Sequence, residues 1–229
     1  MRRPIAAILA LSLAPPILAD IIPIANSSFE SPNFAPALGT LTEAPTAWEG
    51  GGGQFGLIDR GPSSPWHAGI DRTPDAADFE QLAFFSGGYL FQVLPNALAA
   101  FTTYTLAADV GDTDGGTFGY GDLQLGYGAT YSLATFLTPA TAVNPAPSNG
   151  AGTTDGWVRW TCTFQTGAGP AGLGQPLMIA IGGGNTLTLF DNLSLTATPT
   201  PAPGALSFVL LGLLPRSQRR ATRAAQSDR

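Results

Sequence analysis

The chain has 229 residues, of which 44% are hydrophobic and 11% charged, so it can bury a sizeable core. Between Asp20 and Thr200, three Arg stand against fifteen Asp and Glu, which gives this part of the chain a net charge of −12. Such an acidic body lacks the basic face that neutralises phosphates, which argues against nucleic acid as a partner.

The first 19 residues predict a secretory signal peptide. Arg2 and Arg3 precede an apolar run of about a dozen residues, and the small Ala19 marks the expected cleavage site. The run is too short to span a bilayer and Pro15 and Pro16 interrupt it, so a membrane anchor is disfavoured. We therefore expect an exported protein.

Strand-like segments follow, separated by clusters of Gly, Pro, Asn and Asp. In chain order they are DIIPIANSSFE, QFGLID, QLAFFS, YLFQVL, TTYTLAADV, DLQLGYG, YSLATFL, WVRWTCTF, LMIAIGG and TLTLFDNLSLTA. Many short strands without a long helical segment predict an all-β fold, a two-sheet antiparallel β-sandwich over residues 20–198. The first and last strands are expected to pair and close it.

The single cysteine, Cys162, cannot form an internal disulfide, so the fold must be held by its core or by a metal. In WVRWTCTF, apolar residues alternate with polar ones, and Cys162 falls in the same row as Trp160. The alternation predicts a buried core thiol.

The last strand-like segment contains an unexpected carboxylate. Strict alternation places Asp191 on the same face as Leu187, Leu189, Leu193 and Leu195. A carboxylate in an apolar row has to be protonated, paired or bound to a metal, because burying an unpaired charge is too costly.

The composition changes at residues 199–229, where a Thr/Pro spacer leads to an apolar run, Gly204–Leu214, and an Arg-rich end. This tail resembles a PEP-CTERM sorting segment, with Ala202 where that family has Glu in its Pro-Glu-Pro-Gly motif. The resemblance implies a bacterial protein that associates transiently with the membrane through a short C-terminal apolar helix. It also implies recognition by an exosortase-type sorting enzyme and delivery to the cell surface or the extracellular matrix.

The body has a resemblance of its own, carried by IPIANSSFESP, TTYTLAADVG, GLGQPLMIAI and FDNLSLTA. These segments resemble the jelly-roll domain of exported PEP-CTERM proteins, which is related to galactose-binding-like carbohydrate-binding modules and to calcium-dependent Stig cyclases. The resemblance implies a structural Ca²⁺ where the first and last strands meet.

Calcium takes six to eight oxygen ligands. The resemblance assigns Glu30 and Asp191 as side-chain ligands, with Asn26, Ser28 or Asn192 contributing carbonyl oxygens. In the alternative interpretation, Glu30 is exposed and Asp191 caps a turn or pairs with an Arg.

Sugar binding needs aromatic faces for stacking and polar groups for the hydroxyls. The aromatic candidates are Trp48, Trp66, Tyr89, Tyr120, Tyr127 and Trp157. The Gly-rich acidic stretch that runs from Asp109 to Asp122 adds candidate polar groups. From these we predict a ligand site with contributions from Trp48, Trp66, Tyr120, Asp122 and Trp157.

No catalytic motif is present and no catalytic residue is assigned, because the single histidine, His67, has no partner pattern in the sequence. The sequence therefore favours a non-catalytic, exported protein that binds extracellular polysaccharide. Two alternatives remain open. One is a Stig-cyclase-type enzyme with Asp109 or Asp122 as its acid, and the other is a purely structural matrix protein.

Overall fold

A computed structural model describes residues 18–33, 40–59, 81–111, 121–137, 141–143, 157–183 and 187–202. Most of the predicted signal peptide, most of the sorting tail with its apolar helix, and the candidate residues Trp66 and Tyr120 lie outside these ranges. Within the described residues, no helix is long and apolar enough to cross a membrane.

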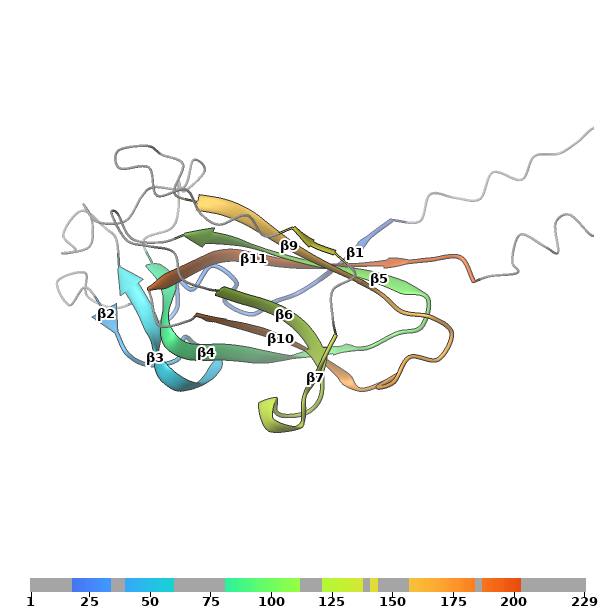
Figure 1. Cartoon of the computed structure of the whole chain (residues 1–229), viewed down its shortest axis with the longest axis horizontal. Coiled ribbons are helices and arrows are strands. Elements are labelled where there is room, and N and C mark those ends of the chain that lie inside the picture. The colour runs from blue at the N-terminus through green and yellow to red at the C-terminus, as the bar shows by residue number, and fades with distance from the viewer. Residues whose placement is uncertain are drawn as a thin grey trace, which may run out of the picture.

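The described residues form short and long β-strands and one 3-10 turn (Figure 1). The elements are β1 (Asp20–Ile22), β2 (Thr40–Leu41), β3 (Glu49–Asp59), β4 (Gln81–Ala97), β5 (Thr102–Gly111), β6 (Gly121–Tyr127), η2 (Tyr131–Leu133), β7 (Thr135–Phe136), β8 (Thr141–Val143), β9 (Trp157–Gln165), β10 (Pro176–Gly183) and β11 (Thr188–Pro199).

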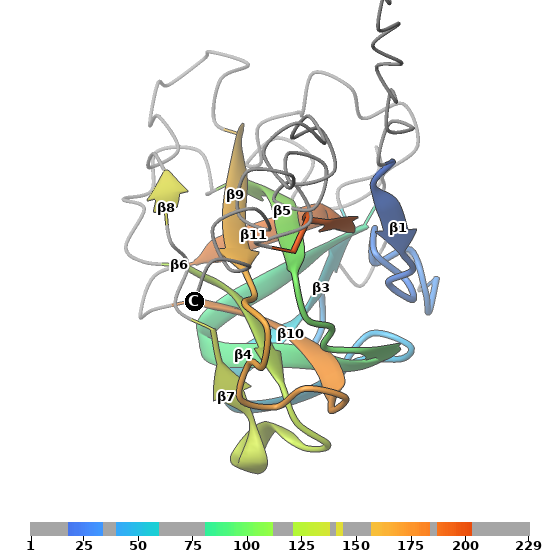
Figure 2. The ribbon, with the colours of Figure 1, turned by 90° about the vertical axis from the view of Figure 1, so that its right-hand side faces the viewer.

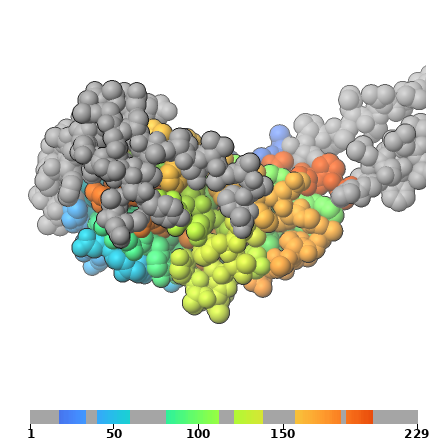
Figure 3. Space-filling model, viewed as in Figure 1, coloured from blue at the N-terminus to red at the C-terminus, as the bar shows by residue number. Residues whose placement is uncertain are grey.

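The strands pack as two layers, which confirms the predicted antiparallel β-sandwich (Figure 2). The front sheet has the order β7-β6-β10-β4-β3, and the back sheet has the order β11-β5-β9-β8 with β1 on the other edge of β11. Strand β4 connects the layers, since its second half pairs with β10 and its first half with β11. The 3-10 turn and its flanking strands, yellow-green in Figure 3, project from the lower edge of the molecule in this view.

The main core lies between the two sheets. Leu90, Leu106, Leu125, Ile179 and Leu195, contributed by both layers, are fully buried there. Trp160 and Cys162 belong to the same cluster, which confirms the predicted buried thiol. Burial raises the pKa of the Cys162 thiol, with a smaller opposing effect from a backbone hydrogen bond at Leu125, so the sulfur is held in its neutral form.

The sequence predictions about strand limits were wrong at β4 and at the 3-10 turn. The segments QLAFFS and YLFQVL form one 17-residue strand, because Gly87, with φ of 78°, lets β4 bend without breaking its pairing with β3. In YSLATFL, Tyr131 lies on the 3-10 turn rather than on a strand.

The N-terminal segment closes the back sheet as predicted. β1 pairs antiparallel with β11, with Ile22 opposite Leu195. The strand ends at Ile22, before Pro23, so Glu30 does not end a first strand as the sequence analysis expected. Instead a turn over residues 25–28 runs beside β11, where the Leu193 amide donates to the Ser27 carbonyl at 2.9 Å.

A β-bulge in β11 breaks the expected leucine row. Asp191 pairs with Asp109 and Ser194 with Ala107, so β11 has one extra residue at Asn192, whose φ is 48°. Leu193 and Leu195 face the main core, whereas Leu189 belongs to a second cluster on the opposite face of the back sheet. Asp191 alternates with the core residue Phe190 and therefore shares the face of Leu189 rather than that of Leu193.

Candidate functional site

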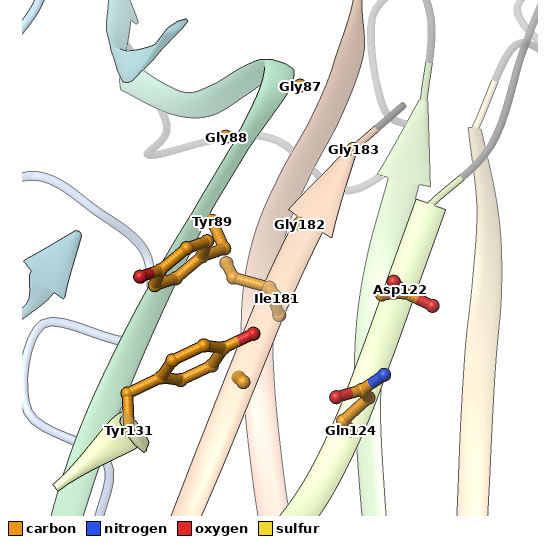
Figure 4. A pocket seen from close by; sticks show the side chains of 10 residues that line it. Gly87, Gly88, Tyr89, Asp122, Gln124, Tyr131, Ile181, Gly182 and Gly183 are labelled. Carbon is orange, nitrogen blue, oxygen red and sulfur yellow. The ribbon is translucent and has the colours of Figure 1, made fainter. Parts of the chain in front are cut away.

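A groove lies on the solvent side of the front sheet, across β4, β10 and β6. Its volume is about 190 Å³. The residues that line it are Gly87, Gly88, Tyr89, Asp122, Gln124, Tyr131, Ala180, Ile181, Gly182 and Gly183. Figure 4 shows the two tyrosines on one side of β10, with Asp122 and Gln124 on the other. We refer to this feature as the tyrosine groove.

Strand register explains why a hollow forms here. Gly182 of β10 pairs with Tyr89 of β4 on one side and with Asp122 of β6 on the other. Neighbouring strands are about 4.8 Å apart, so the Cα atoms of Tyr89 and Asp122 are separated by about 10 Å across a residue without a side chain. Two residues earlier on β10, Ala180 lies between Phe91 of β4 and Gln124 of β6 in the same way. Small residues on the middle strand therefore form the floor between two taller walls.

The aromatic wall depends on the 3-10 turn. Tyr131 stacks on Tyr89 with ring centroids 4.1 Å apart and planes 13° from parallel. Phe91 and Phe136 support Tyr131 with centroids at 5.2 Å and 5.6 Å. Such contacts stabilise a fixed ring orientation. The groove thus has a pre-organised aromatic side.

The opposite wall is polar. Asp122 and Gln124 alternate on β6 with Leu123 and Leu125, which are buried in the main core, so both polar side chains face outward. The pKa of Tyr131 is raised above its ordinary value of 10.0, first by burial and then by the charges of Tyr89 and Asp122. The phenol is therefore neutral at ordinary pH and can donate or accept a hydrogen bond.

An oxygen-rich group lies at the start of β4, away from the groove. The Gln81 amide nitrogen donates to Glu30 Oε1 at 3.2 Å, and Gln81 Nε2 donates to the Glu30 carbonyl at 3.2 Å. Asp59 is paired with Gln81 across β3 and β4, and both side chains are 2% exposed. Gln81 Oε1 is buried without a hydrogen-bond partner. An orphaned buried amide oxygen on a residue that neighbours two carboxylate residues suits a hard cation.

The other predicted calcium ligands are placed elsewhere. Asn26 uses its side chain within its own turn, where Oδ1 accepts from the Ser31 amide and Nδ2 donates to the carbonyls of Ser31 and Thr46. Ser28 lies on the same turn. Asp191 and Asn192 lie at the bulge, where the Asn192 amide donates to Asp191 Oδ1 at 2.7 Å. Among the described residues, no three His, Cys, Asp or Glu side chains form a metal-binding group.

A polar network on the outer face of the back sheet holds the bulge. Arg159 of β9 forms an ion pair with Asp109 at 3.0 Å and donates to the Asn192 carbonyl at 2.6 Å and to Ser194 Oγ at 2.7 Å. Asn192 Nδ2 donates to Asp109 Oδ2 at 3.1 Å. Asp191 is 1% exposed, on the face that carries the second apolar cluster.

The predicted ligand residues do not converge in the described part of the chain. Trp48 is 5% exposed in the main core, where it packs on Phe29 and donates to the Asn26 carbonyl. Trp157 is 9% exposed in the second apolar cluster of the back sheet. Asp122 lies in the tyrosine groove, as does the aromatic candidate Tyr89.

Sequence reasoning missed Tyr131, Gln124, Asp59 and Gln81. Outward-facing residues in LMIAIGG decrease in size from Met178 to Ala180 to Gly182, which is a signal for a depression between neighbouring strands. Gln124 could have been found from its alternation with Leu123 and Leu125. Tyr131 had no such signal, because a short turn brings it over β4.

A family model described as HpiC1 cyclase matches residues 20–196. A solved cyclase from Fischerella sp. TAU is 22% identical with a TM-score of 0.61, covering 81% of this chain and 100% of that chain. A Stig cyclase, Fisc, from the same organism was solved with an indole ligand and is 23% identical with a TM-score of 0.59, covering 80% and 100%.

A xylan-binding CBM22-1 domain from Paenibacillus barcinonensis is 10% identical with a TM-score of 0.42, covering 80% of this chain and 95% of that chain. No curated protein matches the sequence. The likeness to the solved cyclases shows the all-β jelly-roll fold.

Proposed function

Since the chain belongs to the HpiC1-like cyclase family, we propose that its jelly roll binds a ring-shaped ligand in the tyrosine groove. The observation that carries this proposal is the row Tyr89, Gly182 and Asp122 across three adjacent strands. The Cα atoms of the aromatic and the polar wall are about 10 Å apart, which leaves room for a single ring above the small middle residue once the side chains of the walls are taken into account.

The groove suits a hydroxylated ring. The tyrosine wall offers an aromatic surface, and Asp122 and Gln124 offer acceptors and donors for hydroxyl groups. Among the described lining residues Asp122 is the one carboxylate, and no second carboxylate or histidine among them lies beside it to form an acid-base pair. We therefore propose binding without catalysis as the main function, with extracellular polysaccharide as the partner.

A glycan array tests this proposal. Tyr131→Ala removes one ring of the stacked pair and should lower the array signal at least tenfold, within the range measured for aromatic contacts. Leu133→Ala is the matched control, since Leu133 lies on the same turn, is 75% exposed and does not line the groove. Absence of signal for the wild type, or equal signal for all three proteins, contradicts the proposal.

A second candidate function is a cyclase, favoured by the environment of Asp191. Its carboxyl is 1% exposed, on the face of Leu189, which packs with Leu82 and Trp157. The Asp191 carboxyl could protonate an alkene side chain of a bound indole, after which the ring π electrons attack the cation and a ring proton returns to the carboxylate. The product is an isomer with one new C–C bond, and no other reactant is consumed.

Turnover of an alkenyl indole separates the two functions. The cyclase function predicts an isomeric product of unchanged mass, detected by chromatography, with at least a hundredfold loss in Asp191→Asn. Asp20→Asn, which removes an exposed carboxylate opposite Ala197 of β11, is the matched control and should retain turnover. Failure of the wild type to convert any alkenyl indole excludes this second function.

We also propose a structural Ca²⁺ at the start of β4. The group fits calcium because Glu30, Asp59 and Gln81 Oε1 provide carboxylate and amide oxygens, the last of them buried without a partner. These residues would hold the ion, and the ion would compensate their charges. Bound calcium would also tie the turn after β1 to β3 and β4.

Thermal melts test the calcium proposal. Added CaCl₂ should raise the Tm of the wild type by several degrees and chelator should lower it, as expected for a ligand that binds only the folded state. Gln81→Glu preserves shape and should keep the response, whereas Gln81→Leu should weaken it. A wild-type Tm that is unchanged by chelator and by added calcium contradicts the proposal.

Export and surface sorting complete the proposed function. We propose that residues 1–19 direct export and that residues 199–229 serve an exosortase-type sorting enzyme. A bacterial host with and without its exosortase, probed with an antibody against the sandwich, tests this proposal. Equal surface display in both hosts contradicts the role of the tail.

A further inference from the structure

We propose that the tyrosine groove selects a ring ligand that carries a primary ammonium, the chemistry of an amino sugar, over neutral and anionic rings. This inference rests on the proposed binding function and specifies the ligand class of the same site. It is carried by the position of one carboxylate, Asp122, opposite the stacked rings of Tyr89 and Tyr131 (Figure 4).

The charge distribution supports a cationic ligand. Eight Asp and Glu but a single Arg occur in the described ranges, and that residue, Arg159, lies on β9 of the back sheet. Arg159 forms an ion pair with Asp109 and donates a hydrogen bond to the Asn192 carbonyl. Its positive charge therefore lies on the back sheet, away from the groove on the front sheet. Among the described lining residues, Asp122 is the charged one.

The two walls of the groove contact different edges of the ligand. A ring seated over Gly182 has one edge toward Asp122 and the other toward the tyrosines. An ammonium on the Asp122 side forms a charge-assisted hydrogen bond with the carboxylate, while the tyrosine wall contacts the opposite edge of the ring. A carboxylate has about four acceptor positions, so Asp122 can receive the ammonium in addition to the contacts it makes within the protein.

The field of Asp122 extends across the groove. The Asp122 charge is one of the causes that raise the pKa of Tyr131, after burial and the charge of Tyr89. A negative potential that disfavours a tyrosinate also disfavours a ligand carboxylate placed between the walls. The body charge of −12 acts in the same direction at longer range. Uronic acids should therefore bind most weakly.

Four tetrasaccharides with the same linkage test the selectivity by calorimetric titration of the mature chain. They are the tetrasaccharides of glucose, glucosamine, N-acetylglucosamine and glucuronic acid. We expect glucosamine to bind roughly tenfold more tightly than glucose or N-acetylglucosamine, as one charge-assisted contact contributes. We expect glucuronic acid to bind more weakly than glucose.

Two variants locate the selectivity. Asp122→Asn keeps the shape of the side chain and should reduce the glucosamine-to-glucose affinity ratio to near one. Asp20→Asn removes the same charge from an exposed position on β1 of the back sheet and should leave the ratio unchanged, which separates the groove from general attraction to an acidic protein. A ratio that is equal in wild type and Asp122→Asn overturns the inference.

The outcomes also separate this inference from the function on which it rests. Equal binding of glucose and glucosamine overturns the selectivity while the proposed binding function stands. Absence of binding by every tetrasaccharide overturns both.

Discussion

The tyrosine groove and the Asp191 bulge place carboxylates on the two layers of the sandwich by opposite means. On the front sheet, Asp122 follows strict alternation, and its register with Gly182 aligns it with Tyr89. On the back sheet, an extra residue at Asn192 turns Asp191 away from the face that carries Leu193 and Leu195. A regular sheet thus produces an open polar groove, whereas an irregular one positions a buried acid.

The largest effect is expected from deleting Asn192, the extra residue of the bulge in β11. The deletion joins Asp191 to Leu193, so regular alternation keeps Phe190, Leu193 and Leu195 in the core and Asp191 on the outer face. We expect a loss of about 3 kcal/mol in unfolding free energy, because the hydrogen bonds of the Asn192 amide, carbonyl and side chain are removed. Urea denaturation followed by circular dichroism measures it.

Asn192→Gly is the control for the deletion. It preserves the residue count, and glycine accepts the φ of 48° without strain, so the cost should stay below about 1 kcal/mol. A deletion variant as stable as Asn192→Gly would show that the backbone hydrogen bonds of the bulge do not contribute to stability.

A smaller effect is expected from Arg159→Leu, which removes the ion pair to Asp109 and the bonds to the Asn192 carbonyl and Ser194 Oγ. Because the Arg159 side chain is 39% exposed, we expect a loss of about 1–2 kcal/mol rather than that of a buried pair. Arg159→Lys should recover part of it, since an ammonium cannot reproduce the planar set of donors. Urea midpoints of the two variants that equal that of the wild type would contradict a clamping role.

The groove itself is tested by Gly182→Val. Its Cβ would lie 3.1 Å from the Gly88 carbonyl oxygen, so the strands must shift slightly, at a cost of about 1 kcal/mol. The added methyl groups fill the floor, and tetrasaccharide affinity should fall at least tenfold. Gly167→Val is the control, because no atom lies within 4 Å of a Cβ at that exposed position. Unchanged affinity in Gly182→Val places the ligand elsewhere.

The regular strand β6 could be predicted from the sequence, whereas the bulge in β11 could not. The alternation of Leu123, Gln124 and Leu125 predicts which side of β6 faces solvent, and the antiparallel sandwich follows from ten such segments. The bulge could not be predicted, because an extra residue in one strand leaves no periodic signal. The group of Glu30, Asp59 and Gln81 depends on contacts between residues far apart in sequence, which single-chain patterns do not encode.

The smallest expected effect concerns the phenol of Tyr131. Because the Asp122 charge contributes to its raised pKa, Asp122→Asn should lower that pKa toward the ordinary value of 10.0, as measured by NMR titration. In the wild type, the Tyr131 phenol ionises at a lower pH in the unfolded chain than in the folded one. The free energy of unfolding therefore decreases as pH rises from about 10 through the folded-state pKa. An unchanged Tyr131 titration in Asp122→Asn would show that the two walls do not interact electrostatically.

Binding of a ring ligand in the tyrosine groove is tested most directly by NMR mapping with the glucosamine tetrasaccharide. Amide shifts are expected at Gly88, Asp122, Gln124 and Gly182, and no shifts at the outer face of β5 and β9. The same titration with 4-(1H-indol-3-yl)butan-2-one, a ligand of a related Fischerella cyclase, probes the surroundings of Asp191. Saccharide shifts confined to the neighbourhood of Leu189 and Asp191, or absent from the groove, would contradict the proposed site.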